Sequence, residues 1–411
     1  RLFTQKLFWL GFGLAAALDI YNSFAFLYPA IPKIPIEHVD MGKYFTNPPF
    51  NAIGWFPRSF YPFMIGMGYM MPSDFLFSCW FFYLFWKAEV IMSSAVGWSK
   101  IPQFPFANYQ CFGAYMLFGL HALWMGRSYL YRLWRRLQRA PDGLQERNEA
   151  LSYPVAVGLA LVGFVFLVSF SAALKLPVWL GVVFFLIYFG LALAITRMRA
   201  QFGAPVHDLH FTGPDQILTS ALGTRAFNKP SLITFALYWW FNRAYRNHPM
   251  PHMIEAMQMQ DSARASNRGV AQAILLATVV AIIAAFWTSL HMYYDLGARA
   301  QGRMFGGESF PKLATWLLAP AGPNWYALSA IGVGFVFAFG LQTMRLRYMN
   351  WPFHPLGFAI SSNWEMNLVW MPLLIAWVIK TLIVKYGGHK TYQAAAPIFW
   401  GLILGQFVVG S

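Results

Sequence analysis

Charged side chains are scarce in this chain: Asp, Glu, Lys and Arg make up 11% of its 411 residues, against about a quarter of a soluble domain. Cysteine is nearly missing too, because the chain holds only Cys79 and Cys111, and this excludes a disulfide framework. There is no Gly-x-x-x-x-Gly-Lys loop and no Gly-x-Gly-x-x-Gly motif after a strand, so we expect no cofactor. Disorder, collagen and coiled coil are excluded because aromatic residues reach 19%.

Apolar residues, which are 58% of the chain, are grouped in long runs. A helix needs about 20 such residues to cross the hydrocarbon of a bilayer, which is about 30 Å thick. The runs therefore predict an all-α, polytopic membrane protein with about nine transmembrane helices and two interrupted or re-entrant regions. The expected spans are residues 7–28, 75–97, 109–131, 152–173, 177–197, 269–290, 323–345, 366–386 and 396–411. We interpret residues 1–411 as a single transmembrane domain and, because the first residue is not Met, as a fragment of a longer chain.

The basic residues outnumber the acidic ones, 30 to 15, and they gather between the apolar runs. Lys and Arg stay on the cytoplasmic side of a membrane. The arginine-rich residues 132–150 therefore predict a cytoplasmic basic loop, and segments 29–58 and 291–322 are placed outside. No basic soluble domain is visible, so the expected partner is the lipid bilayer and not nucleic acid.

The first interrupted region is an apolar arm at residues 59–71, which is too short to cross the membrane. Because the basic loop is placed on the cytoplasmic side, the span 109–131 that leads into it must begin outside, and segment 29–58 is outside too. A single crossing by 75–97 would not return the chain to the outside. The arm is therefore expected to enter the membrane, turn just after its last residue and return as the span 75–97. Pro72 is tolerated at the start of the returning helix. Ser73 or Asp74 is expected to cap the free amides there.

The second interrupted region is residues 198–268, which we interpret as a re-entrant segment and cytoplasmic connector. It contains short apolar pieces broken at residues 213–215 and 228–230. Non-helical backbone enters a membrane only where protein or a water-filled cavity satisfies it. Paired apolar segments interrupted by Gly or Pro point to the binding site of a transporter. Asp74 and Asp215 stand at the two breaks and are therefore candidate site residues.

Acids and bases inside the spans also need an explanation, since each costs about 2.5–3.5 kcal/mol at membrane depth. Asp19 is the most deeply placed, and Asn22 lies one helical turn further on. Two interpretations stay open: a buried acid satisfied by its neighbours, or a site that couples to a proton or ion. Glu365 is interpreted as a cap or rim residue. Lys380 is expected to snorkel to the membrane surface or to bond to a neighbouring helix.

Four histidines have metal-ligand spacing. His207 and His210 are three residues apart, and His248 and His252 are four apart. Two prolines separate the second pair, which predicts that no regular helix crosses it. We favour loop histidines over a metal site, and we expect no resident metal.

Three stretches of the chain resemble the oligopeptide transporter (OPT) superfamily, and more narrowly a bacterial branch of large multi-span proteins. They are GMGYMMPSDFLFS at 66–78, TRMRAQFGAP at 196–205 and ASNRGVAQ at 265–272. In the second stretch the family has an acid shortly before the glycine, where this chain has Gln201. The resemblance covers about three quarters of the chain. It implies a carrier in a bacterial cytoplasmic membrane that moves peptides or metal chelates with protons.

These observations predict a secondary transporter for a small organic solute, peptide or metal chelate, coupled to protons or another cation, and not an enzyme. The candidate binding residues are Asp19, Asn22, Asp74, Asp215 and Gln201. Two alternatives stay open: a metal-dependent membrane-embedded enzyme that uses the four histidines, and a non-transporting membrane scaffold. A homo-oligomer is compatible with both the prediction and the alternatives.

Overall fold

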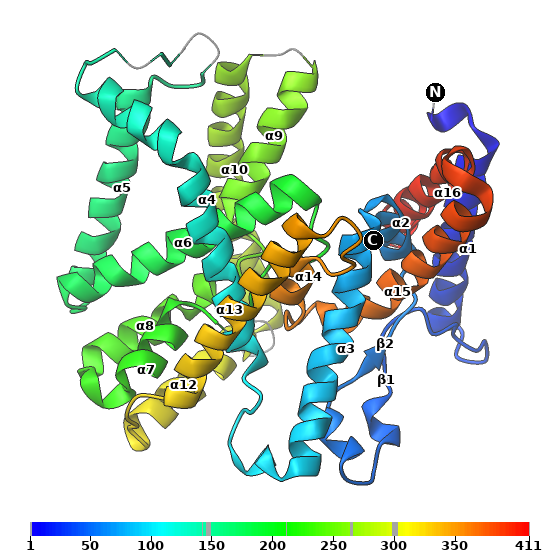
Figure 1. Cartoon of the computed structure of the whole chain (residues 1–411), viewed down its shortest axis with the longest axis horizontal. Helices are drawn as coiled ribbons and strands as arrows, with labels where there is room; N and C mark the ends of the chain where they lie inside the picture. The colour runs from blue at the N-terminus through cyan, green and yellow to red at the C-terminus, as the bar shows by residue number, and fades with distance from the viewer. Residues whose placement is uncertain are drawn as a thin grey trace. The chain divides into compact units, whose positions relative to one another are not determined.

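The computed structural model describes residues 2–141, 143–144, 149–210, 212–263, 266–297 and 303–410. Parts of the predicted basic loop, of the connector and of the outside segment 291–322 lie outside these ranges, as does Ala265 of the third resembling stretch. The described chain is mainly helical (Figure 1). Its only described sheet pairs strand β1 (Val39–Asp40) with β2 (Pro57–Arg58) in antiparallel register.

The helices follow the apolar runs of the sequence. They are α1 (Lys6–Leu27), α2 (Pro62–Met70), α3 (Ser73–Val96), α4 (Ala107–Leu137), α5 (Tyr153–Ala173), α6 (Val178–Phe202), α7 (Pro214–Leu222), α8 (Lys229–Asn242), α9 (Pro249–Ala263), α10 (Asn267–Leu296), α12 (Arg303–Leu318), α13 (Trp325–Arg347), α14 (Pro355–Ile360), α15 (Met366–Leu382) and α16 (Gly388–Val409).

Each expected span coincides with a helix. Seven stretches among the described residues are long and apolar enough to cross a membrane, and the run Met366–Val409 counts as one of them. Within that run a π-helical turn, Ile383–Gly387, joins α15 to α16, and α4 is not among the seven. The all-α, membrane-embedded character is confirmed, whereas the count of nine spans is not.

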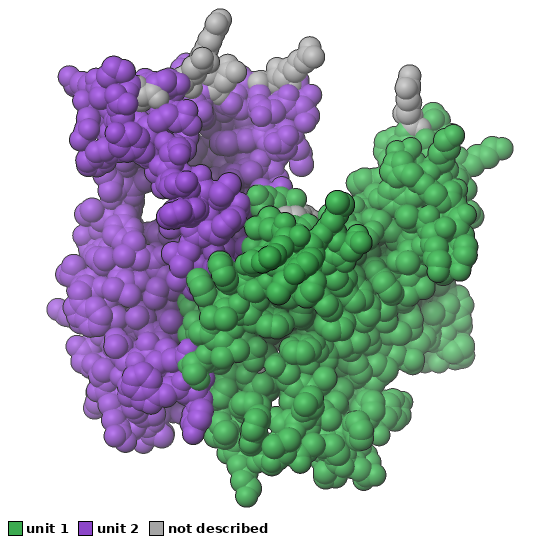
Figure 2. Space-filling model, viewed as in Figure 1, with its two compact units in different colours: residues 1–115, 201–209, 329–411 green, residues 116–200, 210–328 purple. Residues whose placement is uncertain are grey.

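The chain forms two compact units (Figure 2). Unit 1 consists of residues 1–115, 201–209 and 329–411, and unit 2 consists of residues 116–200 and 210–328. Helices α4 and α13 each contribute residues to both units, because the boundaries at residues 115 and 329 fall inside them.

Unit 1 is built on close helix packing. Helix α16 lies along α1 and also contacts α2 (Figure 1). A Cβ atom at Gly11 would lie 2.0 Å from the carbonyl oxygen of Ile398, and one at Gly401 would lie 2.1 Å from that of Phe8. No real Cβ approaches backbone so closely, so α1 and α16 can pack in this way only because both positions are glycine.

The expected break in unit 1 lies where the sequence places it, since α2 ends at Met70 and α3 begins at Ser73. The expected cap is wrong. Pro72 occupies the N-cap position, and no side chain caps the helix. The carboxylate of Asp74 is drawn instead to a distant guanidinium, described below, because an ion pair satisfies it better than an amide does.

Lys380 of α15 is buried at the end of α2, with 7% of its surface exposed. Its ammonium donates to the carbonyl oxygens of Tyr69, at 3.1 Å, and Met71. The last carbonyls of a helix have no partner within that helix, and Lys380 satisfies two of them. The expected bond to a neighbouring helix is confirmed, and snorkelling to the surface is wrong.

Unit 2 has an aromatic core. Its buried members come from α5, α6, α7, α8, α12 and the turn between α5 and α6, and they include Phe184, Phe185, Phe235, Tyr238 and Trp316. The phenol of Tyr238 is satisfied by Ser171, 2.7 Å away.

The connector of unit 2 is more helical than the sequence suggested. The side chain of Asn228 caps α8 by accepting from the amide of Ser231 at 2.9 Å. The prediction that no regular helix crosses the pair of His248 and His252 is confirmed, because α9 begins at Pro249 and leaves His248 outside it. Prolines are tolerated there because the first amides of a helix have no partner within it.

Candidate functional site

Unit 1 contains a pocket of about 530 Å³ between the C-terminal half of α1, the following loop and the end of α16. Its lining residues are Asp19, Asn22, Ser23, Phe26, Leu27, Lys33, Ile36, Glu37, Tyr61, Gln406, Val409 and Gly410. Two of the predicted site residues, Asp19 and Asn22, therefore share one cavity. Its volume lies within the range of about 300–1,000 Å³ that is usual for small-molecule sites.

Asp19 is the distinctive side chain of this pocket. Its Oδ2 atom is buried and has no hydrogen-bond partner among the described residues. Gly410 leaves the space that the carboxylate occupies, since a Cβ there would lie 2.6 Å from Oδ2. A buried carboxylate oxygen without a partner gains free energy from a proton or a bound cationic group.

Asn22 lines the pocket and also holds the loop after α1. Its side chain donates to the carbonyl oxygen of Ile34 at 3.1 Å and accepts from the amide of Ile34 at 2.9 Å. Both ends of the amide are therefore used, and Asn22 fixes the loop after α1 at the side of the pocket.

Charges and an anchored helix end complete the pocket. Lys33 and Glu37 form an exposed ion pair of 3.1 Å in the loop. On the opposite wall, Oε1 of Gln406 accepts from the amide of Phe63 at 2.8 Å, which ties α16 to the first turn of α2. The pocket thus has a half-buried acid, Asp19, and both signs of charge on an exposed side.

Asp74 lies elsewhere in unit 1 and is not among the pocket-lining residues. Its Oδ2 accepts from Nη2 of Arg345 at 2.9 Å, and both side chains are about one third exposed. Nearby, Nδ1 of His354 caps α14 by accepting from the amide of Leu356 at 3.1 Å. Burial, helped by the charge of Arg345, lowers the pKa of His354 to about 3, so the imidazole is neutral when it caps the helix.

Asp215 is fully buried in unit 2, in the first turn of α7. Its carboxylate accepts from Nζ of Lys312 at 2.7 Å and from Nδ2 of Asn242 at 3.0 Å. Nζ of Lys312 also lies 3.9 Å from the ring centroid of Trp239. The predicted site residue is therefore compensated by a cation and an amide.

Gln201, the last predicted site residue, is exposed near the C-terminal end of α6. Sequence reasoning did not predict the bases that pair with Asp74 and Asp215. Lys312 and Arg345 stand 97 and 271 residues along the chain from their acids. The only sequence signal for them was that each is a base beside or within an apolar run.

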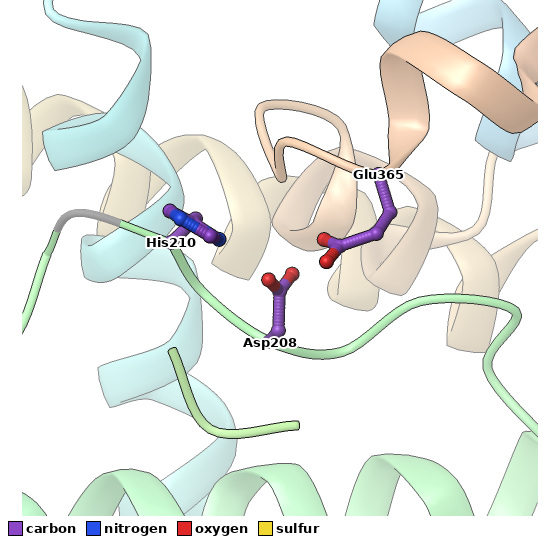
Figure 3. A group of neighbouring side chains, drawn as sticks. All are labelled: Asp208, His210 and Glu365. Atoms are coloured by element: carbon purple, nitrogen blue, oxygen red, sulfur yellow. The ribbon is translucent and has the colours of Figure 1, made fainter. Parts of the chain in front are cut away.

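A second cluster joins the stretch between α6 and α7 to the start of α15. Asp208, His210 and Glu365 each offer one metal-ligand atom, and these atoms all lie within 4.8 Å of one another (Figure 3).

Only one of the four candidate histidines, His210, belongs to this cluster. His248 accepts from the amide of Met250 at 3.3 Å, and Nδ1 of His252 lies 3.9 Å from the carboxylate of Glu255. Burial lowers the pKa of His248. Sequence reasoning missed Asp208 and Glu365 as members, because a loop residue and a helix-start residue 157 positions apart carry no local sign of meeting.

No curated protein and no solved structure matches this chain. The resemblance to oligopeptide transporters therefore stays a prediction. A family model does match, over residues 1–411. The chain belongs to DUF6785, a family of unknown function.

Proposed function

We propose that this protein is a secondary active transporter for a small organic solute of the peptide or metal-chelate class, coupled to protons or another cation. The observation that carries the proposal is Asp19. It is an acid within a membrane-spanning helix, with a buried oxygen that has no hydrogen-bond partner among the described residues, in the wall of a pocket of about 530 Å³.

The carboxyl group of Asp19 supplies a means of coupling. Inside an apolar helix it is stable when it holds a proton or when a cationic group lies against it. A carrier that alternates between two sides of a membrane can therefore exchange the proton of Asp19 for a solute on one side and regain the proton on the other. Coupling of this kind needs only one acid that changes charge during the cycle.

The charges of the pocket favour a zwitterionic solute. Asp19 and Glu37 can receive an ammonium group, while Lys33 can receive a carboxylate. Short peptides carry both groups. The resemblance to oligopeptide transporters points to the same class of solute.

The interrupted helices support transport rather than a scaffold. The break between α2 and α3 in unit 1 and the break between α7 and α8 in unit 2 leave backbone groups that a continuous helix would satisfy. Side chains bond some of them, Lys380 at the end of α2 and Asn228 at the start of α8. Transporters use such breaks to form solute sites and to move.

Transport by purified protein in liposomes tests the proposal. A panel of labelled dipeptides, amino acids and metal chelates is offered under an imposed proton gradient and, separately, under a sodium gradient. We expect gradient-driven uptake of at least one solute by the wild type, and at least a tenfold loss of uptake in Asp19→Asn. Asp295→Asn, which removes an exposed acid from α10 in unit 2, is the matched control and should transport like the wild type.

Two results would reject the proposal. One is the absence of gradient-driven uptake across the whole panel. The other is wild-type uptake by Asp19→Asn, because the carboxyl group would then play no part in coupling.

A further inference from the structure

We propose that Asp208, His210 and Glu365 bind one divalent transition-metal ion. Asp208 and His210 stand two residues apart on the stretch between α6 and α7, and Glu365 directly precedes α15. Figure 3 shows the carboxylates of Asp208 and Glu365 turned toward one another, with the imidazole of His210 beside them. The proposal is independent of the transport pocket, because none of the three residues lines that pocket.

The distances suit a shared ion. Imidazole nitrogens and carboxylate oxygens bind zinc at about 2.0–2.2 Å, so two ligands on opposite sides of one ion are about 4.4 Å apart. The ligand atoms of the cluster lie within 4.8 Å of one another. Each pair of ligand atoms is therefore at most about 0.4 Å further apart than two ligands on opposite sides of one ion.

The burial of these side chains favours a bound cation. Asp208 is 2% exposed, His210 is 4% exposed and Glu365 is half-buried. Two carboxylates held this close repel one another, and the repulsion is strong where little water screens it. A divalent ion offsets both negative charges, and a neutral imidazole adds a ligand without adding charge.

The donor set selects the metal. One imidazole and two carboxylates suit Mn²⁺, Fe²⁺, Co²⁺ or Zn²⁺, whereas Ca²⁺ and Mg²⁺ prefer oxygen alone and Cu⁺ prefers sulfur. Three protein ligands leave at least one coordination position open. The site can therefore bind a further molecule such as water or a chelating solute.

The segment that carries Glu365 is held in place. Two residues earlier, the side chain of Asn363 donates to the phenol oxygen of Tyr115 at 3.2 Å, and both residues are buried. This bond ties the start of α15 to α4. A ligand on a fixed segment loses little conformational freedom when it binds a metal.

Metal content and metal-dependent stability test the proposal. The full chain is purified in detergent, stripped with a chelator, loaded with Mn²⁺ or Zn²⁺ and desalted, and the bound metal is counted by mass spectrometry. We expect about one ion per chain in the wild type and at least tenfold weaker binding in Asp208→Asn and in Glu365→Gln. Added metal should raise the unfolding temperature of the wild type but not of these two variants, because only the folded site binds it.

His291→Ala is the matched control. His291 and Asp295 form an exposed pair of 3.2 Å on α10, so this variant removes an imidazole beside a carboxylate at a place where no ion is expected. It should bind metal like the wild type. If Asp208→Asn does not fold, the isosteric Glu365→Gln decides alone. A wild type without stoichiometric metal after loading, or a folded Glu365→Gln that binds as tightly as the wild type, overturns the proposal.

Discussion

The acids at the two predicted helix breaks, Asp74 in unit 1 and Asp215 in unit 2, lie in different surroundings. In unit 1, Asp74 and Arg345 are 30% and 34% exposed in their side chains, so water reaches both ends of the pair. In unit 2, the side chain of Asp215 is fully buried and that of Lys312 is 20% exposed. Both acids stand in the first turn of a helix, close after a proline. The same local signal therefore leads to one solvated ion pair and one buried ion pair.

The difference shows that burial, and not the sequence motif, sets how much such an acid contributes to the free energy of unfolding. A solvated ion pair contributes about 0–1 kcal/mol, because water competes for both charges. A buried pair need not stabilise the fold relative to apolar residues, but the loss of one partner leaves a buried charge that costs several kcal/mol. Asp215 accordingly has two hydrogen-bond donors, and its cation lies against an aromatic ring.

The largest predicted effect comes from neutralising the buried acid. Asp215→Asn should lower the free energy of unfolding by about 3 kcal/mol, the low end of the range for a broken buried pair, because Lys312 still reaches some water. Its matched partner, Asp74→Asn, should lower it by about 1 kcal/mol or less. Denaturant-induced unfolding in detergent micelles measures both. Equal losses in the two variants would show that the two surroundings do not differ as described.

A smaller effect tests the close packing that is particular to unit 1. Gly11→Ala should lower the free energy of unfolding by about 1–3 kcal/mol, because the new methyl group meets the backbone of α16 and overpacks the contact. Gly13→Ala is the control, since a Cβ there has no neighbour within 4 Å. The control should be neutral or slightly stabilising, because alanine favours helix over glycine by about 1 kcal/mol or less. Thermal unfolding of the two variants measures the difference. A harmless Gly11→Ala would mean that α1 and α16 are further apart.

The last comparison is of the acid sensitivity of the two units. The folded pKa of His354 is about 3, against 6.5 for a free histidine, because burial opposes its charged form. The unfolded chain therefore binds a proton first, so unit 1 should lose stability as the pH falls from about 6.5 toward 3.

In unit 2 the hydrogen bonds from Arg243 lower the pKa of Glu308 below its usual value of 4.5. That contribution is fully present above pH 4.5 and is lost as the pH falls through the folded pKa. Unfolding temperatures measured from pH 7 to pH 4 should fall less in His354→Gln than in the wild type, whereas Glu308→Gln should change the curve only near its acidic end. Identical curves for the two variants would contradict this assignment.

The helices themselves could be predicted, because each depends on the residues within it. Long apolar runs predicted α1, α3, α5, α6, α10 and α13 close to their observed bounds, and Pro72 marked the break before α3. Two local predictions were wrong for one reason. The expected cap at Ser73 or Asp74 and the surface position of Lys380 both ignored what another helix brings to the same place.

The candidate sites were only half predictable. Asp19 and Asn22 were found because an acid and an amide one turn apart stand out in an apolar helix, and both line the pocket. The loop that closes the pocket, with Lys33 and Glu37, gave no such sign. The cluster of Asp208, His210 and Glu365 was divided in the sequence between a histidine motif and a helix start.

Composition and the order of apolar and breaking residues thus determined that this protein is helical, that it belongs in a membrane and where its helices are interrupted, because lipid leaves the backbone few other ways to satisfy its hydrogen bonds. Tertiary structure alone decided which charges meet. Arg345 reaches Asp74, Lys312 reaches Asp215 and Lys380 reaches the end of α2 across 97 to 311 residues of chain. Electrostatic and hydrogen-bond energies depend on distance and on the surrounding dielectric. Neither the distance nor the dielectric can be predicted from the local sequence, because both are set when the helices pack.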